Sequence, residues 1–302
     1  MGEKRPRTAV PQVARALCAV ECGERIPTVS ELVERSGASR GSVQNALAHL
    51  KEVGAVELEP HGQRGTLLVG VDYLALAREA GVDHLVGVMP LPYTLRYEGI
   101  ATGLFTLFAR SPLRTYITFL RGSEGRVRSL DDGFASYCVL SRLAFDVLVA
   151  DGAKISVVLD LGEESYVARH VIVRREGARA SWDGTRIGVD VTSVDQRLLT
   201  ERYFANEHVE FVPVQYSNIV EMVRTGQIDA AIWNVDDIHT TDDGIVVEEL
   251  GRVGTGGADT RAVVATRSDD DLCARLLSQL VDVDELGRIQ RSVMAGETLP
   301  RY

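Results

Sequence analysis

The sequence predicts an α/β protein in which an N-terminal winged helix-turn-helix precedes a larger, two-lobed α/β domain. Three observations support this fold class. Residues 1–71 contain three helical stretches and a hairpin, residues 82–302 alternate between strand-like and helix-like runs, and that alternation occurs twice. The chain of 302 residues is also long enough for two domains.

Composition narrows the class of protein further. Apolar residues make up 45% of the chain and charged residues 25%, which excludes a disordered or fibrous protein. No run of about 18 apolar residues is present and the N-terminus is polar, so we expect a cytoplasmic protein without a membrane partner. The cysteines form no Cys-x-x-Cys pair and have no partnering histidines, so we expect buried thiols at Cys18, Cys22, Cys138 and Cys273.

Charge is distributed unevenly along the chain. The net charge is −10, yet residues 1–70 carry nine Lys or Arg against eight Asp or Glu, which leaves −11 on the remainder. Phosphate binding needs local positive potential. DNA binding is therefore compatible with the first domain, and the acidic larger part is expected to have another task.

Three helices are expected in the first domain. Residues 11–23 carry apolar residues at helical intervals and end at Gly23. A second helix begins at Thr28, which forms the Thr-x-x-Glu capping-box pattern with Glu31. A third runs from Ser39 to about Val53, and its apolar stripe consists of Val43, Ala46, Leu47, Leu50 and Val53.

The polar face of the third helix has the composition of a DNA-reading surface. A helix in the major groove needs small residues close to the bases and amide or guanidinium groups to read them. The helix N-terminus with its serines can also receive a phosphate. We therefore expect DNA contacts from Ser39, Arg40, Gly41, Ser42, Gln44 and Asn45.

A hairpin follows this helix. Residues 55–59 and 66–71 read as two short strands, and a glycine-containing loop joins them. The loop places His61, Gly62 and Arg64 where a wing would contact phosphates or the minor groove. The alternative is that the helices and hairpin form a protein-docking module or a structural cap.

The first domain resembles the winged helix-turn-helix of GntR-type regulators. Three segments carry this resemblance: the run Ser36-Gly-Ala-Ser-Arg-Gly-Ser-Val-Gln-Asn-Ala-Leu-x-x-Leu, Gly-Ala-Val at 54–56, and the His61-Gly62 turn. In that family the residues at positions 39, 40, 41, 44 and the wing pair face DNA. Gln44 stands where many members carry Arg, so the resemblance does not supply the operator sequence.

A helix at 72–82 connects the halves, and the rest of the chain predicts two α/β lobes with mainly parallel sheets. The two series align at Gly133-Phe-Ala-Ser-Tyr-Cys-Val-Leu-Ser141 and Gly226-Gln-Ile-Asp-Ala-Ala-Ile-Trp-Asn234. We assign residues 1–71 to the winged helix-turn-helix and 72–302 to the two-lobed domain. Within it, lobe 1 spans about 82–176 and 255–302 and lobe 2 about 180–252, with crossings in the glycine-rich segments 177–184 and 251–257.

Two lobes imply a cleft, and in open α/β sheets ligands bind beyond the carboxyl ends of strands. The N–H groups of Thr192 and Ser193 precede a helix and are expected to take an anionic group of a ligand. Each candidate has a structural alternative, such as an N-cap at Ser141, a turn at Asp190 or an acidic loop at Asp236. The nominated residues are Pro90, Tyr93, Ser141, Arg142, Asp190, Thr192, Ser193, Asn234 and Asp236.

A wider resemblance covers most of the chain. The chain resembles the YhfZ-type transcriptional regulators in four segments: residues 89–104, Arg186-Ile-Gly-Val-Asp, Ser193-Val-Asp-Gln and Gly226-Gln-Ile-Asp-Ala-Ala-Ile-Trp-Asn. These join a winged helix to a domain similar to type 2 periplasmic binding proteins. The resemblance implies the fold and a regulatory task but no particular effector.

The sequence contains no Gly-x-x-x-x-Gly-Lys, Gly-x-Gly-x-x-Gly or His-Glu-x-x-His motif. Its Gly-x-Ser-x-Gly match, Gly37-Ala-Ser-Arg-Gly41, lies in the turn between two expected helices, whereas a nucleophile elbow joins a strand to a helix. Residues 236–243 include metal-ligand types, but the spacing favours an exposed acidic turn. We therefore expect no catalytic residues, no metal and no cofactor.

The sequence thus predicts a ligand-responsive transcriptional regulator. Its expected partners are a double-stranded DNA operator, a small and anionic effector, and a second copy of the chain, because a two-fold operator matches a homodimer. Two alternatives remain: an enzyme on a type 2 periplasmic-binding-protein-like fold, and a small-molecule binding module without DNA activity.

Overall fold

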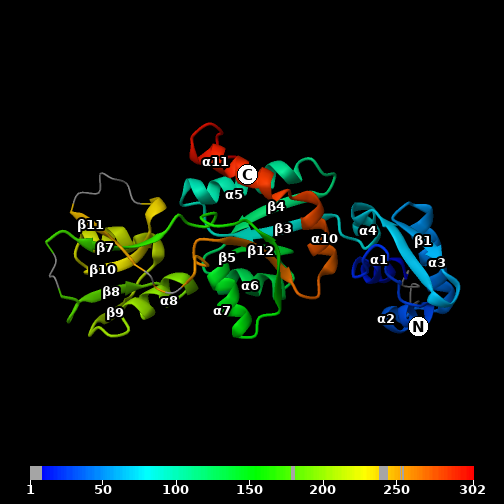
Figure 1. Cartoon of the computed structure of the whole chain (residues 1–302), viewed down its shortest axis with the longest axis horizontal. Helices are drawn as coiled ribbons and strands as arrows, with labels where there is room; N and C mark the ends of the chain where they lie inside the picture. The colour runs from blue at the N-terminus through cyan, green and yellow to red at the C-terminus, as the bar shows by residue number, and fades with distance from the viewer. Residues whose placement is uncertain (1–8, 178–180, 238–243, 252, 254) are drawn as a thin grey trace, which may run out of the picture. The chain divides into compact units, whose positions relative to one another are not determined.

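The computed structural model describes residues 9–177, 181–237, 244–251, 253 and 255–302 (Figure 1). The chain forms two compact units. The first comprises Met1–Leu85, Ser111–Thr115 and Ser268–Leu280, and the second Val86–Arg110, Tyr116–Arg267 and Val281–Tyr302. This division differs from the expected boundary at residue 71, because helix α10 (Asp271–Leu280) packs against helices α1 and α4 of the first unit.

The first unit is a winged helix-turn-helix. Thr28 and Glu31 form the expected capping box, in which the Thr28 N–H donates to Glu31 Oε2 at 2.6 Å. Buried Leu17, Leu32 and Leu50 form the centre of the unit. Its elements up to residue 79 are α1 (Val10–Cys18), α2 (Val29–Ser36), α3 (Arg40–Glu52), β1 (Val56–Pro60), η1 (Gly62–Arg64), β2 (Thr66–Val71) and α4 (Tyr73–Glu79), and α10 completes the unit.

Helix α1 ends earlier than the apolar pattern predicts. It stops at Cys18 rather than at Gly23, and the segment beyond it runs beside β2. There the Gly23 N–H donates to the Leu68 carbonyl at 2.7 Å and the Ile26 N–H to the Thr66 carbonyl at 2.9 Å. The backbone of these residues therefore bonds to the wing instead of continuing the helix, and Val20 is buried without being helical.

The second unit contains two five-stranded sheets. The first has the strand order β4-β3-β5-β12-β6 and the second β11-β7-β10-β8-β9. The first consists of β3 (His84–Met89), β4 (Arg114–Phe119), β5 (Tyr137–Ser141), β6 (Ile155–Asp160) and β12 (Ala262–Arg267). The second consists of β7 (His170–Arg175), β8 (Arg186–Val189), β9 (Glu210–Pro213), β10 (Ala230–Asn234) and β11 (Ile245–Glu249).

The two sheets have the same arrangement of strands. Read from β9, the second sheet has the order β9-β8-β10-β7-β11, which corresponds strand by strand to β4-β3-β5-β12-β6. The central strands β5 and β10 are the pair that the sequence repeat aligned, and each has one parallel and one antiparallel neighbour. Gly133 and Gly226, at the ends of the preceding helices, both have positive φ. The sheets are mixed rather than mainly parallel, because β12 and β7 enter antiparallel.

The crossing between the lobes lies elsewhere than expected. We placed residues 154–174 in lobe 1, but β7 pairs with β10 and β11 of the second sheet. The chain therefore crosses in residues 161–169, and 177–184 joins two strands of one sheet. The chain returns to the first lobe between β11 and β12, as expected. Residues 178–180, 252 and 254 lie outside the described part of the chain.

Helices cover both faces of each sheet (Figure 1). In the first lobe α6 and α7 lie on one face and α5 and α11 on the other. In the second, Ala231 and Trp233 of β10 pack towards α9, while Ala230 and Ile232 pack towards α8, as the alternation of a strand requires. The helices are α5 (Leu95–Phe108), α6 (Ser123–Asp131), α7 (Arg142–Ala150), α8 (Val194–Tyr203), α9 (Ile219–Arg224) and α11 (Val283–Met294).

The four cysteines are free thiols. Cys18, Cys138 and Cys273 are buried, as expected. Cys22 is exposed, which contradicts the expectation, because α1 has ended before it.

Candidate functional site

The polar face of α3 is open to solvent. Ser39 is the N-cap and its Oγ accepts from the Ser42 N–H at 3.1 Å, while Val43 and Leu50 on the opposite face are buried. Ser42 is half-buried. The predicted DNA-reading residues Ser39, Arg40, Gly41, Gln44 and Asn45 are all exposed.

The wing has the predicted form. Strands β1 and β2 pair antiparallel, and the His61 N–H donates to the Gly65 carbonyl at 2.7 Å to close the turn. Gly62 has a φ of +56°, a conformation that L side chains rarely adopt. His61, Gly62 and Arg64 are exposed, so both expected DNA-contacting segments lie on the surface.

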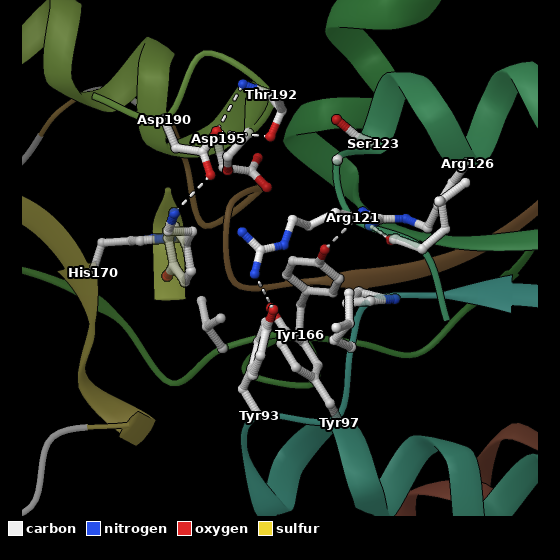
Figure 2. Close-up of a pocket in the computed structure, with 17 residues that line it drawn as sticks. Tyr93, Tyr97, Arg121, Ser123, Arg126, Tyr166, His170, Asp190, Thr192 and Asp195 are labelled. Atoms are coloured by element: carbon white, nitrogen blue, oxygen red, sulfur yellow. Dashed lines mark hydrogen bonds between the residues drawn. The ribbon is translucent and has the colours of Figure 1, made fainter. Parts of the chain in front are cut away.

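The second unit contains an open hollow at the carboxyl ends of strands from both sheets, and its empty space of about 620 Å³ includes open solvent. We call it the cleft (Figure 2). It is lined by Pro90, Leu91, Tyr93, Tyr97, Leu120, Arg121, Gly122, Ser123, Arg126, Tyr166, Val167, His170, Asp190, Thr192, Ser193, Asp195 and Tyr216.

Arg126 of α6 is the least expected group in the cleft. Its side chain is buried, with 4% of the residue exposed. Nη1 donates to the Leu120 carbonyl at 2.9 Å and Nη2 to the Tyr166 hydroxyl at 3.2 Å, but the buried Nε has no hydrogen-bond partner. Among the ion pairs of the described residues, none neutralises this guanidinium. A buried cation that forms no ion pair is costly, so the site favours an anion.

The N-terminus of α6 lies at the same wall. Gly122 is its N-cap, provides no side-chain cap, and has a φ of +74°. A Cβ at this position would lie 2.9 Å from the Thr192 carbonyl oxygen of the other lobe. Ser123 Oγ is buried without a partner. Open N–H groups, the helix dipole and an unpaired hydroxyl thus converge beside Arg126, an arrangement that binds anions.

Arg121 connects the two lobes at the cleft. Its Nη2 donates to the Tyr93 hydroxyl and to Ser217 Oγ, each at 3.0 Å. The side chain is exposed and extends across the space between the labelled residues in Figure 2. Arg121 therefore brings a second positive charge to the cleft.

Aromatic rings form much of the remaining wall. Tyr97 and Tyr166 meet edge to face with ring centroids 5.1 Å apart, and burial raises the pKa of both phenols. Tyr216 stacks on Trp233 at 3.9 Å. Tyr97 and Tyr166 therefore stay neutral, and all three rings line the cleft.

Asp190 has a structural role on the opposite wall. Its Oδ1 accepts from the Thr192 N–H at 2.9 Å and from Thr192 Oγ1 at 2.7 Å, and its Oδ2 accepts from the Tyr216 N–H at 2.9 Å. The Ser193 N–H donates to the Asp190 carbonyl at 3.1 Å. The expectation that the Thr192 and Ser193 N–H groups take an anion is therefore wrong, because both are already used within this turn.

Asp195, in the first turn of α8, is the other carboxylate of the cleft. It is 7% exposed, and Ser141 Oγ lies 2.6 Å and 2.8 Å from its two oxygens. Burial raises the pKa of Asp195 to about 6, against a smaller lowering by the Ser141 hydroxyl. The carboxylate is thus mainly ionised at neutral pH.

Five of the nine nominated ligand residues line the cleft, namely Pro90, Tyr93, Asp190, Thr192 and Ser193. The other four lie outside its lining and have structural partners. Ser141 caps α7 and reaches Asp195, and the Arg142 Nε donates to Asp146 at 2.8 Å.

The remaining two belong to the second lobe. Asn234 Nδ2 donates to the Tyr216 hydroxyl at 2.9 Å, so Asn234 lies behind a lining residue. Asp236 accepts from the Ala168 N–H at 2.8 Å and forms an ion pair with Arg96. Its carboxylate therefore ties the second lobe to the crossing segment and to α5.

The sequence did not nominate several charged, polar and aromatic residues that line the cleft, namely Tyr97, Arg121, Ser123, Arg126, Tyr166, His170 and Asp195. One signal was available. The rule on carboxyl ends of strands was applied to β3, β5, β8 and β10, but β4 ends at Phe119, directly before Arg121 and Ser123. Applied there, the rule would have nominated both.

Two negative findings concern the described residues. In the part of the chain that the structure describes, no group of three or more His, Cys, Asp or Glu side chains is arranged to hold a metal ion. Within the same residues, no helix has the length and apolar character needed to cross a membrane. Most of the acidic segment 236–243 lies outside the described residues.

The fold and these two surfaces define a helix-turn-helix protein with a binding-protein-like domain, the architecture of a DNA-binding regulator. A helix-turn-helix domain family matches residues 21–68, and the YhfZ C-terminal domain matches residues 72–302. The chain belongs to the YhfZ family. It is 34% identical over 309 aligned positions to "Uncharacterized protein YhfZ" of Escherichia coli (strain K12), covering 99% of this chain and 98% of that one.

Solved structures agree with this assignment. The crystal structure of YhfZ from Shigella flexneri matches with a TM-score of 0.65 and 34% identity, covering 76% of this chain and 98% of that one. The periplasmic aliphatic sulphonate binding protein SsuA from Escherichia coli matches at 0.53 with 13% identity, covering 71% and 75%. A double mutant of the Bordetella pertussis BvgS VFT2 domain matches at 0.51 with 20% identity, covering 72% and 96%. The last two share the fold alone.

Proposed function

We propose that this protein is a dimeric transcriptional regulator that acts in the cytoplasm and senses a small anionic metabolite in the cleft. The observation that carries the proposal is the buried guanidinium of Arg126, whose Nε has no partner beside an equally unpaired Ser123 Oγ. An anion bound there would receive charge-assisted hydrogen bonds from both groups and from the α6 N-terminus. Arg121 would approach the same ligand from the rim of the cleft.

The DNA-binding part of the proposal is supported by the exposed face of α3 and by the wing. Gln44 and Asn45 carry amides that can read an adenine edge, and Gly41 permits close approach to the bases. Arg64 of the wing can contact a phosphate. A homodimer on a two-fold operator is the arrangement that such a domain uses.

Coupling between the two activities would come from the lobes. The cleft is lined by both lobes, so a bound ligand stabilises the state in which their walls contact it together. If that state differs from the open one in operator affinity, the ligand shifts the equilibrium of DNA binding. The direction of the effect is an outcome of the experiment.

The test begins with a panel of monocarboxylates, dicarboxylates, phosphate esters and amino acids, screened by thermal shift on the full-length protein. We expect at least one anion to stabilise the wild type, to lose this effect in Arg126→Met, and to retain it in Arg128→Met. Arg128 is the matched control because it lies on the same helix with an exposed side chain. The same compound is then added to mobility-shift assays with genomic DNA fragments.

Two results would contradict the proposal. One is the absence of sequence-specific retardation at any fragment, which would leave a binding module without DNA activity. The other is an anion that stabilises Arg126→Met as well as the wild type, which would remove the cleft assignment. Turnover of the stabilising compound would instead favour an enzyme.

A further inference from the structure

The cleft contains two buried groups of opposite charge on facing walls. Arg126 enters from α6 of the first lobe and Asp195 from α8 of the second (Figure 2). They are 4% and 7% exposed. Among the ion pairs of the described residues, none joins them, although both line the same hollow. The cleft therefore has a positive and a negative subsite instead of an internal salt bridge.

Asp195 differs from its neighbour Asp190 in what its oxygens accept. Asp190 accepts from the N–H and the hydroxyl of Thr192 in its own turn and from the more distant Tyr216 N–H. The side chain of Asp195 has the Ser141 hydroxyl as its donor, and a hydroxyl has a single proton to give to two carboxylate oxygens. An ionised carboxylate can accept about four hydrogen bonds, so Asp195 keeps capacity for a donor in the cleft.

The electrostatics of the cleft disfavour a ligand with one kind of charge. A simple anion on Arg126 would also face the ionised Asp195, and a simple cation on Asp195 would face Arg126, both in a site of low dielectric constant. A ligand with an ammonium at one end and an anionic group at the other neutralises both. Tyr97 and Tyr166 then provide an aromatic wall for its apolar part.

We propose that the metabolite sensed in the cleft is a small zwitterion of the amino-acid class, with its carboxylate on Arg126 and Ser123 and its ammonium on Asp195. This inference rests on the anion site of the proposed function and modifies its ligand: the metabolite carries an ammonium beside its anionic group, so it is a zwitterion instead of a simple anion. It assigns Asp195 as a residue that sets specificity, because it distinguishes an amino acid from the corresponding hydroxy acid.

The experiment uses isothermal titration of the full-length protein with each of the common L-amino acids. Every binder is compared with its matched 2-hydroxy acid, in which a hydroxyl replaces the ammonium, and with its decarboxylated amine. We expect the amino acid to bind at least about tenfold more tightly than either relative, because each relative leaves one buried charge unpaired. We expect Asp195→Asn to lower affinity for the amino acid about ten- to a hundredfold while leaving the hydroxy acid unaffected or improved.

Two variants separate charge from structure. Ser141→Ala removes the hydroxyl that contacts Asp195 but keeps the carboxylate, so it should still prefer the amino acid over the hydroxy acid. Glu124→Gln removes a negative charge from the exposed side of α6 and should bind the amino acid as the wild type does. Proton release on binding is an additional readout, and it is measured by calorimetric titration near pH 6 in buffers of different ionisation enthalpy. Ammonium binding should release a proton from Asp195 in the wild type and none in Asp195→Asn.

Three outcomes would overturn the inference. If the hydroxy acid binds as tightly as the amino acid and Asp195→Asn affects both alike, the zwitterion is excluded and the anion site remains. If none of the L-amino acids binds the wild type, the amino-acid class is excluded, while a response to other anions would still support the proposed function. If an amino acid binds Arg126→Met as tightly as the wild type, the anion site of the proposed function fails as well.

Discussion

The exposed face of α3 and the cleft of the second unit illustrate opposite ways of building a binding surface. On α3 and its N-cap the six candidate residues lie within the seven positions from Ser39 to Asn45, and Val43 is the buried residue of this stretch. In the cleft, Arg126 and Asp195 come from different lobes and are buried. One surface depends on a single helix, and the other depends on the packing of a whole domain.

Because one surface is exposed and the other is buried, substitutions in the two should differ in their effects on folding stability and on binding affinity. Residues such as Gln44 are hydrated in the free protein, so removing them should affect DNA binding more than folding. Arg126 and Asp195 are desolvated whether or not a ligand is bound, so they should affect both stability and ligand affinity. Mutations can therefore test whether the two surfaces differ as the structure implies.

The largest effect is expected at the core beneath the α3 face. Leu50 is fully buried, and Leu50→Ala should lower the free energy of unfolding by about 2–5 kcal/mol through lost burial and a cavity. Specific DNA binding should weaken with it. Urea denaturation measures the change, and Leu299→Ala, at a residue 84% exposed, should change stability by less than about 0.5 kcal/mol. Equal effects of the two substitutions would show that α3 is not anchored as described.

The next effect concerns the buried carboxylate of the cleft. Its pKa is about 6 in the folded chain against an ordinary value of 3.8, because of burial. The folded state therefore binds this proton more tightly, and the resulting stabilisation is present below about pH 4 and is lost as pH rises through 6. Relative to the wild type, Asp195→Asn should gain about 3 kcal/mol of stability between pH 4 and pH 7.

Urea unfolding of both proteins across this range provides the measurement. The groups that interact with Asp195 are the Ser141 hydroxyl, His170, Asp259 and Arg126, so the comparison is made between proteins at each pH rather than along one curve. Parallel stability profiles for the two proteins would contradict the burial of an ionisable group at this position.

A smaller effect is expected at the DNA-reading face itself. Gln44→Ala should weaken binding to the specific operator by about 1–3 kcal/mol and leave non-specific binding nearly unchanged. Arg64→Ala should weaken binding to all sequences and reduce the salt slope by about one unit. Fluorescence anisotropy at several salt concentrations separates the two. Identical sequence dependence in both variants would remove the distinction between base reading and phosphate contact.

The smallest effect is expected at the start of the same helix. Ser39 Oγ accepts from the Ser42 N–H, so Ser39→Ala should cost about 1 kcal/mol of stability through loss of the cap. Ser39→Asp should retain the cap while repelling phosphate, and would therefore be stable but bind DNA weakly. Thermal unfolding and anisotropy together test this. A stable Ser39→Ala variant would mean that α3 does not need its cap.

Much of the fold could be predicted because its signals are local. The capping box at Thr28 and Glu31, the apolar stripe of α3 and the wing depend on residues a few positions apart, and the structure contains each of them. Val53 is the exception in the predicted stripe, because it follows the end of α3 and is 43% exposed. The repeat of Gly133–Ser141 in Gly226–Asn234 correctly paired the two central strands. Errors arose where distant segments compete for the backbone, as at the end of α1, where β2 takes the hydrogen bonds that would have extended the helix.

The cleft could be predicted only in part. The rule on strand ends brought Pro90, Tyr93, Asp190, Thr192 and Ser193 to its lining. It also selected two residues outside the lining. Asn234 Nδ2 donates to the Tyr216 hydroxyl, although the buried Asn234 Oδ1 has no partner, and Asp236 forms an ion pair with Arg96. Whether a polar side chain after a strand finds such partners depends on residues that lie up to 140 positions away, as Arg96 does from Asp236.

The order of residues alone was sufficient for the helix-turn-helix and the two similar lobes, because hydrophobic periodicity, caps and turns act over short distances along the chain. The family followed from the resemblance of its sequence segments to known regulators. Packing of the lobes was needed to show that β7 joins the second sheet, that Asp190 is already occupied, and that Arg126 and Asp195 share a cleft without pairing. Burial and hydrogen-bond satisfaction are properties of atoms gathered from distant positions, and these properties give Arg126 and Asp195 their capacity to bind a ligand.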